Sequence, residues 1–390
     1  MINMRLTLKE TFYLLTGWLT LFVIGTDLFV ISPLLLFIAN EYGITPAVAG
    51  WMVTVFSLMY AISAPFFGWL SDRKGRRFFI IFGLLTFCLS NFLTAISSSF
   101  TMLIISRIMA GSSVAAITPL VYAIIGDTAP PERRGVWLSV VVSGHLMALW
   151  AGAPIGTLLE LFLGWRSVFI GLATIAALLS ILNFRVWASI NEVPSVEAPT
   201  KGSTIRMICA VSVTTIWAIS MYALYVFLGT GLIIYNHFSS GELAFSITAY
   251  GIGAVIGSLS SGRVTDKIGT RRVSIFSTAT LIGILPLLGL FFSTGTLVYV
   301  VLFFWALIGY ASFTSYQARL VEEFPETRGM VLALNNTALY IGITLGSMMG
   351  GFVITKWGFF ALPFICSAIA LISCIITVKR KNTTQKGDVN

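Results

Sequence analysis

The chain has 390 residues, of which 57% are hydrophobic and only 10% are charged. Soluble proteins contain about 25% charged residues, and a water-soluble fold of this length would need far more polar surface. The composition therefore argues against a soluble enzyme and, despite a net charge of +9, against a nucleic-acid-binding protein.

Apolar runs predict twelve transmembrane helices, because a spanning helix needs about 20 mostly apolar residues. We expect an all-α integral membrane protein built from two bundles of six helices. The bundles cover 1–187 and 207–380, joined by a cytoplasmic loop at 188–206 and followed by a disordered tail at 381–390. The predicted spans are 12–37, 47–69, 78–97, 101–126, 135–160, 165–187, 207–230, 245–262, 273–292, 296–317, 329–353 and 358–378.

The Lys and Arg residues predict the orientation of these spans. Nearly all of the 24 cations lie at the N-terminus, in every second loop or in the tail, while the opposite loops hold only Arg166 and Lys356. Because basic loops stay in the cytoplasm, we expect both termini there, in a multi-pass protein of a bacterial cytoplasmic membrane. The positive charge is then a topology signal and requires no nucleic acid.

Asp27 lies inside the first span, with no charged neighbour in the sequence. A lone carboxylate in a membrane faces a cavity or a partner, and burial favours its neutral form, so it can carry a coupling proton. Arg107, inside the fourth span, is predicted at a similar depth and is the obvious ion-pair partner or substrate contact. A structural ion pair and a proton- or substrate-binding role both remain open.

The fifth span carries His145, which titrates near neutral pH and can relay a proton, or can be a neutral, hydrogen-bonded histidine. Small residues recur along the same span at Gly144, Gly152 and Gly156, beside Pro154. This spacing suits close helix packing, and the proline allows bending. A gating helix and ordinary packing are both consistent with the pattern.

Spans seven, ten and eleven combine amides with aromatic rings that have polar tips. Such side chains suit a cavity for a cyclic, partly apolar solute, although many membrane aromatics face lipid or form the interfacial belt. The candidate cavity residues are Tyr222, Trp305, Asn335 and Asn336.

The two halves of the chain repeat at an offset of 194 residues. GWLSDRKGRR begins at Gly68 and GRVTDKIGTR at Gly262, and ERRG begins at Glu132 while ETRG begins at Glu326. Two matches at one offset indicate a duplication, a layout typical of transporters with parallel repeats.

These motifs resemble the major facilitator superfamily over almost the whole chain, and within it the twelve-span drug:proton antiporter branch, which includes multidrug, sugar and purine-nucleoside exporters. The fourth span matches through Arg107 and Gly111, and the fifth through its Gly/Pro motif, with Ala153 where a glycine is usual. The loop after the second span matches through Gly68, Leu70, Asp72, Arg73, Gly75, Arg76 and Arg77.

The resemblance implies proton-coupled efflux of small organic molecules such as drugs, by alternating access. Export of a sugar or nucleoside metabolite, and proton-coupled import, are the alternatives. It also implies a conformational latch formed by Gly68, Asp72, Arg73, Gly75, Arg76 and Arg77, with a weaker second copy at Asp266.

The expected partners are a small-molecule substrate, protons and lipid, and the protein is expected to be a monomer without cofactor or metal. A membrane enzyme or receptor ranks behind, because the sequence carries no zinc motif, nucleophile elbow or cofactor fingerprint.

Overall fold

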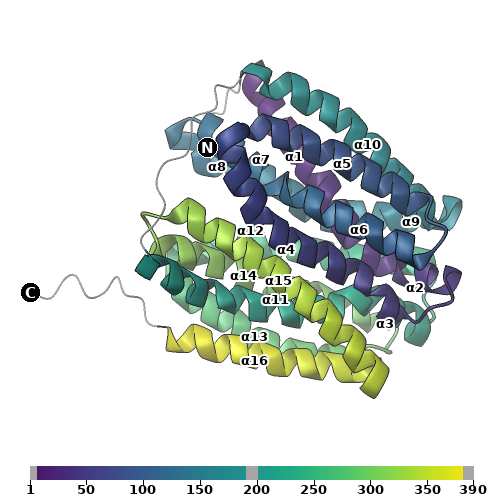
Figure 1. Ribbon diagram of the computed structural model, residues 1–390. Helices are drawn as coiled ribbons and strands as arrows, with labels where there is room; N and C mark the ends of the chain where they lie inside the picture. The colour runs from purple at the N-terminus through teal and green to yellow at the C-terminus, as the bar shows by residue number, and fades with distance from the viewer. Residues whose placement is uncertain (1–6, 190–200, 381–390) are drawn as a thin grey trace, which may run out of the picture. The chain divides into compact units, whose positions relative to one another are not determined.

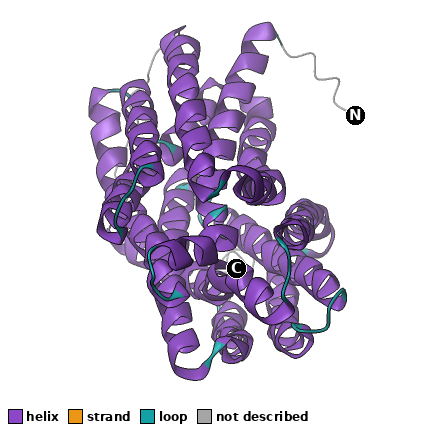
Figure 2. Ribbon diagram, turned by 90° about the vertical axis from the view of Figure 1, so that its right-hand side faces the viewer, coloured by secondary structure: helices purple, strands orange, loops and turns teal. Residues whose placement is uncertain are grey.

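The computed structural model describes residues 7–189 and 201–380, and all regular secondary structure in these residues is helical (Figure 2). Within them, twelve helical segments are long and apolar enough to cross a membrane. The all-α fold and the number of spans are therefore confirmed. The predicted tail at 381–390, and positions 190–200 of the predicted central loop, lie outside the described residues.

The chain divides into two compact units, and the first consists of residues 1–31 and 58–196. Most of its helices pack in pairs, such as α5 with α10 and α1 with α8. In chain order its helices are α1 (Leu8–Phe29), the second part of α4 (Trp51–Lys74), α5 (Arg76–Ala95), α6 (Phe100–Ala115), α7 (Thr118–Thr128), α8 (Arg134–Met147), α9 (Ala153–Leu163) and α10 (Trp165–Val186).

The second unit consists of residues 32–57 together with everything from residue 197 onward. Within it, α11 lies beside α15 and α13 beside α16 (Figure 1). Its helices are α2 (Ile31–Glu41), α3 (Pro46–Ala49), the first part of α4, α11 (Lys201–Asn236), α12 (Ser240–Ile268), α13 (Thr270–Phe291), α14 (Leu297–Glu323), α15 (Arg328–Trp357) and α16 (Leu362–Lys379).

Residues 32–57 differ from the expected division, which places them in the N-terminal bundle. Hydrogen bonds connect them to the helices of the second unit. The Ser32 hydroxyl donates to the Tyr225 carbonyl at 2.5 Å, and the Ser347 hydroxyl donates to the Gly50 carbonyl at 2.9 Å. The end of the first span and the start of the second therefore pack on α11 and α15.

The first and fourth predicted spans are each divided into two helices near a proline. The first consists of α1 and α2, and the fourth of α6 and α7. A proline cannot donate a main-chain hydrogen bond and clashes with the carbonyl four residues earlier. Pro33 lies four residues after Phe29, the last residue of α1, and Pro119 lies four residues after Ala115, the last residue of α6. The prolines thus account for both breaks.

The duplication is visible in the backbone conformation. Gly75 before α5 and Gly269 before α13 have φ angles of 94° and 90°. Gly164 before α10 and Gly358 before α16 have φ angles of 75° and 80°. Each pair is separated by 194 residues, and such angles favour glycine, so both units retain the same glycine-dependent turns.

One hydrogen bond is repeated at the same offset. Arg77 Nη2 donates to the Phe184 carbonyl at 2.6 Å, and Arg271 Nη2 donates to the Val378 carbonyl at 3.3 Å. Each bond joins the start of one helix to the end of another within its own unit. The repeat therefore extends from sequence to side-chain contacts.

Candidate functional site

A buried ion pair joins α1 to α6 in the first unit. Arg107 Nη1 donates to Asp27 Oδ1 at 2.9 Å, and Arg107 Nη2 donates to Asp27 Oδ2 at 2.6 Å. The two side chains are only 1% and 0% exposed. Acceptance by both oxygens is the geometry of an ionised carboxylate, and charge-assisted bidentate pairs are the strong class of hydrogen bond.

An aromatic ring lies close to the pair. The Arg107 guanidinium lies 5.7 Å from the ring centroid of Phe169 on α10. At an offset of 194 residues, Asp27 corresponds to Met221 and Arg107 to Val301, neither of which carries a charge. A six-helix unit of this fold thus forms without such a pair, which favours a functional role for it in the first unit.

His145, on α8, packs against a different face of α1 from the one that carries Asp27. Its ring centroid is 5.2 Å from that of Phe29, and a Cβ placed on Gly25 would lie 3.0 Å from His145 Nδ1. Residues 25 and 29 are one helical turn apart, whereas Asp27 is rotated by roughly 200° from Gly25. The structure therefore pairs Asp27 with Arg107 and separates His145 from both. His145 Nδ1 is buried and has no hydrogen-bond partner among the described residues.

The predicted gating residues lie where the fifth span changes its helical form. The span consists of α8 and α9 with a π-helical turn between them at Ala148–Gly152, and Pro154 follows this turn directly. Because the proline removes one α-helical hydrogen bond, it accounts for the change, and π turns occur frequently at functional sites.

The glycines of this span allow it to approach α1 closely. A Cβ on Gly152 would collide with the side chain of Thr26, which neighbours Asp27. A Cβ on Gly144 would collide with the Trp18 backbone carbonyl, and a Cβ on Gly156 with the Val30 side chain. These three glycines therefore pack against α1 within the first unit. The gating role predicted for them stays a proposal.

Aromatic side chains form a continuous cluster in the second unit, here called the aromatic cluster. Tyr222 and Tyr225 have ring centroids 6.1 Å apart, Tyr225 and Tyr250 are 5.1 Å apart, and Tyr250 and Trp305 are 4.8 Å apart. Two of the predicted cavity residues, Tyr222 and Trp305, are thus brought into one group. Its members are Trp217, Tyr222, Tyr225, Tyr250, Trp305, Tyr310 and Phe313, from α11, α12 and α14.

The two predicted amides, Asn335 and Asn336, are not members of the aromatic cluster. Asn335 is 1% exposed, and its Oδ1 accepts a hydrogen bond of 2.5 Å from the Thr214 hydroxyl. This bond connects α15 to α11, so Asn335 supports the packing of the two helices. Asn336 is half-buried on the same helix.

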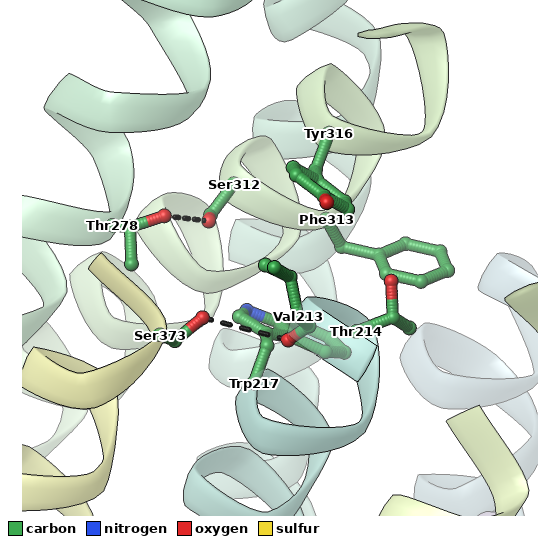
Figure 3. A pocket seen from close by; sticks show the side chains of 8 residues that line it. All are labelled: Val213, Thr214, Trp217, Thr278, Ser312, Phe313, Tyr316 and Ser373. Carbon is green, nitrogen blue, oxygen red and sulfur yellow. Dashed lines mark hydrogen bonds between the residues drawn. The ribbon is translucent and has the colours of Figure 1, made fainter. Parts of the chain in front are cut away.

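A small pocket adjoins the Trp217 end of the aromatic cluster, between α11, α13, α14 and α16 (Figure 3). Its volume is about 10 Å³, which is room for about one water-sized group. We call it the hydroxyl pocket. It is lined by Val213, Thr214, Trp217, Thr278, Ser312, Phe313, Tyr316 and Ser373.

The predicted latch residues have partners inside their own unit. Arg76 forms an ion pair with Asp127 at the end of α7, and Arg77 also stacks on the Phe184 ring at 4.5 Å. Arg73 lies 4.2 Å from the Trp69 ring. Exposed ion pairs of this kind contribute at most about 1 kcal/mol to stability, so a latch would have to act through several contacts together.

The remaining latch positions are Gly68, Asp72, Gly75 and Asp266, and no contact within the described residues shows by itself that they form a latch. Gly75 forms the turn before α5, but a Cβ on Gly68 would meet no atom within 4 Å. The Asp72 side chain lies outside the described part of the structure. Asp266 is exposed and forms no ion pair within residues 7–189 and 201–380. The latch therefore stays a prediction.

Arg319 is buried although it lies beyond the predicted tenth span, 296–317. It is 1% exposed, because α14 continues to Glu323. Arg319 Nη1 donates to the Thr377 carbonyl at 3.1 Å and Nη2 to the Arg380 carbonyl at 2.5 Å. Arg319 thus caps the C-terminus of α16. In the sequence, only the length of α14 could have indicated that Arg319 lies inside a helix.

No group of three or more potential metal ligands occurs among the described residues. The chain offers two candidate binding elements, the ion pair in the first unit and the aromatic cluster with its pocket in the second.

A family model described as the Major Facilitator Superfamily matches residues 17–235 and 207–389. Among its relatives, the chain is 28% identical to the uncharacterized MFS-type transporter YceJ of Bacillus subtilis, over 94% of this chain and 97% of that protein. It is 25% identical to a probable sugar efflux transporter of Helicobacter pylori, over 94% of this chain and 95% of that protein.

Solved structures share the fold at lower sequence identity. A D-xylose-proton symporter superposes with a TM-score of 0.81 at 16% identity, over 96% of this chain and 99% of the other. A bacterial homologue of the human lysosomal transporter Spinster, inward-facing and occupied, superposes with a TM-score of 0.76 at 18% identity, over 96% and 97% of the two chains. At these identities the likeness shows the fold alone.

Proposed function

Because the chain belongs to the major facilitator superfamily, and is therefore a multi-pass membrane transporter and not an enzyme, we propose that it exports small organic solutes in exchange for protons. The observation that carries this proposal is the fully buried Asp27–Arg107 pair. Export across the cell membrane would follow alternating access. Membership of the drug:proton antiporter branch is part of the proposal.

The pair provides a way for a proton to change the packing of helices. A proton on Asp27 removes the negative charge of the carboxylate and makes one of its oxygens a donor with reduced acceptor capacity. The bidentate contact is thereby weakened, and a buried guanidinium left without an anionic partner is costly. Protonation therefore favours a rearrangement of α1 against α6. A proton taken up outside and released inside would couple this rearrangement to solute export.

The solute class favoured is a neutral, ring-shaped molecule such as a sugar. The aromatic cluster contains no charged side chain, and its Tyr and Trp residues combine ring faces with hydrogen-bonding tips. Several relatives at 24–25% identity are named probable sugar efflux transporters. A cationic drug, which the resemblance also implies, would find no carboxylate among these rings.

A flux assay in proteoliposomes tests the coupling. Wild-type protein should move a member of a sugar, nucleoside and drug panel outward faster when a pH gradient is imposed. Asp27→Asn keeps the size of the side chain but cannot lose a proton, so its flux should become independent of the gradient.

Glu326→Gln is the matched control, because Glu326 is an exposed carboxylate outside the proposed site, and it should behave as wild type. Gradient-driven flux in the Asp27→Asn variant at the wild-type rate would refute the assignment. Counterflow in vesicles of known orientation distinguishes export from import.

A further inference from the structure

The hydroxyl pocket of the second unit is independent of the ion pair, and its hydrogen bonds show which chemical group it fits. Of its eight lining side chains, none is charged, and only Phe313 is not fully buried. Trp217 stacks on Phe313, with ring centroids 4.9 Å apart and planes at 26°. The pocket therefore combines stacked aromatic rings with hydroxyl groups.

The hydroxyl protons on the α11 and α14 side of the pocket are already donated to the protein. Thr214 donates to Asn335 Oδ1 at 2.5 Å, and Tyr316 donates to the Ala210 carbonyl at 2.7 Å. Each of these oxygens still has a lone pair available. On this side the pocket therefore offers acceptors.

On the α13 side of the pocket, the hydroxyl protons are likewise donated to other protein groups. Thr278 donates to the Ser274 carbonyl at 2.7 Å, and the Thr278 and Ser312 hydroxyls lie 2.6 Å apart, so Ser312 is the donor in that contact (Figure 3). Ser373 donates to the Val213 carbonyl over a longer distance of 3.5 Å. The oxygen of Ser312 thus remains available as an acceptor.

Trp217 supplies the missing donor. Its side chain is 4% exposed, and Nε1 is buried without an acceptor among the described residues. Figure 3 shows this nitrogen on the edge of the indole turned toward the Ser373 hydroxyl. A buried donor without a partner costs about 1–3 kcal/mol, so a group that accepts from this N–H is favoured.

One N–H donor beside several oxygen acceptors fits a hydroxyl group, which accepts one hydrogen bond and donates another. An ammonium group would leave the Trp217 N–H unpaired. A carboxylate would find one firm donor and no cation among the lining residues. We propose that the pocket binds one hydroxyl group of the transported solute, so that the transporter selects neutral, polyhydroxylated molecules.

This inference rests on the proposed export function, and it adds a recognition rule with Trp217 as the specificity residue. The pocket has room for about one hydroxyl oxygen. The sugar ring itself would therefore remain outside, against Phe313. If one hydroxyl group is bound in this way, the deoxy analogue that lacks this hydroxyl should bind more weakly than the parent sugar.

The test compares D-glucose with its monodeoxy analogues in competition for export by reconstituted protein. Wild type should prefer glucose over one analogue by about tenfold or more, the effect of losing a buried hydrogen bond. Trp217→Phe keeps an aromatic ring but removes the N–H, so this preference should fall to nearly one. Flux should still respond to the pH gradient.

Trp137→Phe is the control, because Trp137 is a buried tryptophan of the first unit whose Nε1 also has no partner among the described residues. It should keep the wild-type preference. Ser312→Ala, which removes an acceptor, should weaken discrimination against the same analogue, and it replaces Trp217→Phe as the test if the latter does not fold.

Two results would overturn the inference. One is an unchanged preference in Trp217→Phe, and if the melting temperature of this variant is also lower, the pocket holds only water. The other is an equal loss of affinity for every sugar. If wild-type protein exports no sugar of the panel, the proposed substrate class fails. Failure of the pocket inference alone would instead leave sugar export intact.

Discussion

The Asp27 and Arg107 side chains stabilise each other, and either one without its partner would destabilise the fold. Both are buried, so removing one partner leaves an uncompensated buried charge, at a cost of about 3–5 kcal/mol. Replacing both with apolar residues of similar size is often neutral for stability. This asymmetry separates a coupling role from a structural one.

We predict that Arg107→Met lowers the melting temperature in detergent markedly, while the double variant Asp27→Leu/Arg107→Met recovers most of the loss. Proton-driven flux should be absent from both. Thermal denaturation with a flux assay on the same preparations checks this. A double variant that is both stable and proton-coupled would assign the pair a purely structural role.

The sequence predicts these two residues because charges are rare inside the spans and the two lie at similar depths. It could not place His145, because the face on which a side chain lies depends on the rotation of each helix. His145 lies against Gly25 and Phe29, away from the pair. Partners from distant helices, such as Thr214 with Asn335, leave no pattern in one sequence.

At the scale of elements, the packing of the fifth span on α1 is the tightest contact near the ion pair. Gly152 lies at the end of the π turn and directly against Thr26, one residue before Asp27. A larger side chain must displace α1 there, and overpacking typically costs about 1–3 kcal/mol.

We therefore expect Gly152→Val to reduce both stability and proton-coupled flux. Gly171→Val is the control, since a Cβ at Gly171 on α10 would meet no atom within 4 Å, and it should stay close to wild type. Melting temperatures and flux rates of the two variants provide the comparison. Equal behaviour of the two variants would contradict the proposed contact between α1 and the π turn.

The existence of the helices was predictable, but their interruptions were recognised only in the structure. The signal was present in Pro33 and Pro119, each four residues after the end of a helix. Proline is tolerated within other helices of the same chain, such as Pro65 in α4 and Pro286 in α13. Whether a proline breaks a helix therefore depends on packing that a single sequence does not show.

At the scale of the whole molecule, the two halves share turns and have diverged in charge. Arg76 pairs with Asp127 in the first unit, whereas Thr270, at an offset of 194, donates to Glu322 at 2.6 Å in the second. The same connection between neighbouring helices is an ion pair in one copy and a hydroxyl-to-carboxylate hydrogen bond in the other. The buried Asp27–Arg107 pair likewise has uncharged counterparts, Met221 and Val301, in the second copy.

The function proposed above assigns a proton-responsive pair to the first unit and a neutral recognition surface to the second. Composition and the repeat predicted the twelve spans and the two sets of six. The assignment of residues 32–57 to the second unit was not predictable, because it depends on side-chain hydrogen bonds such as Ser32 to Tyr225.

The central claim is that Asp27 exchanges a proton when the solute binds. Proton release by purified protein in weakly buffered detergent, on addition of the sugar that wild type exports fastest, tests it without any vesicle. By linkage, wild type should release up to about one proton per bound solute. Asp27→Asn should bind the solute and release none. Equal proton release from the two proteins would contradict the account.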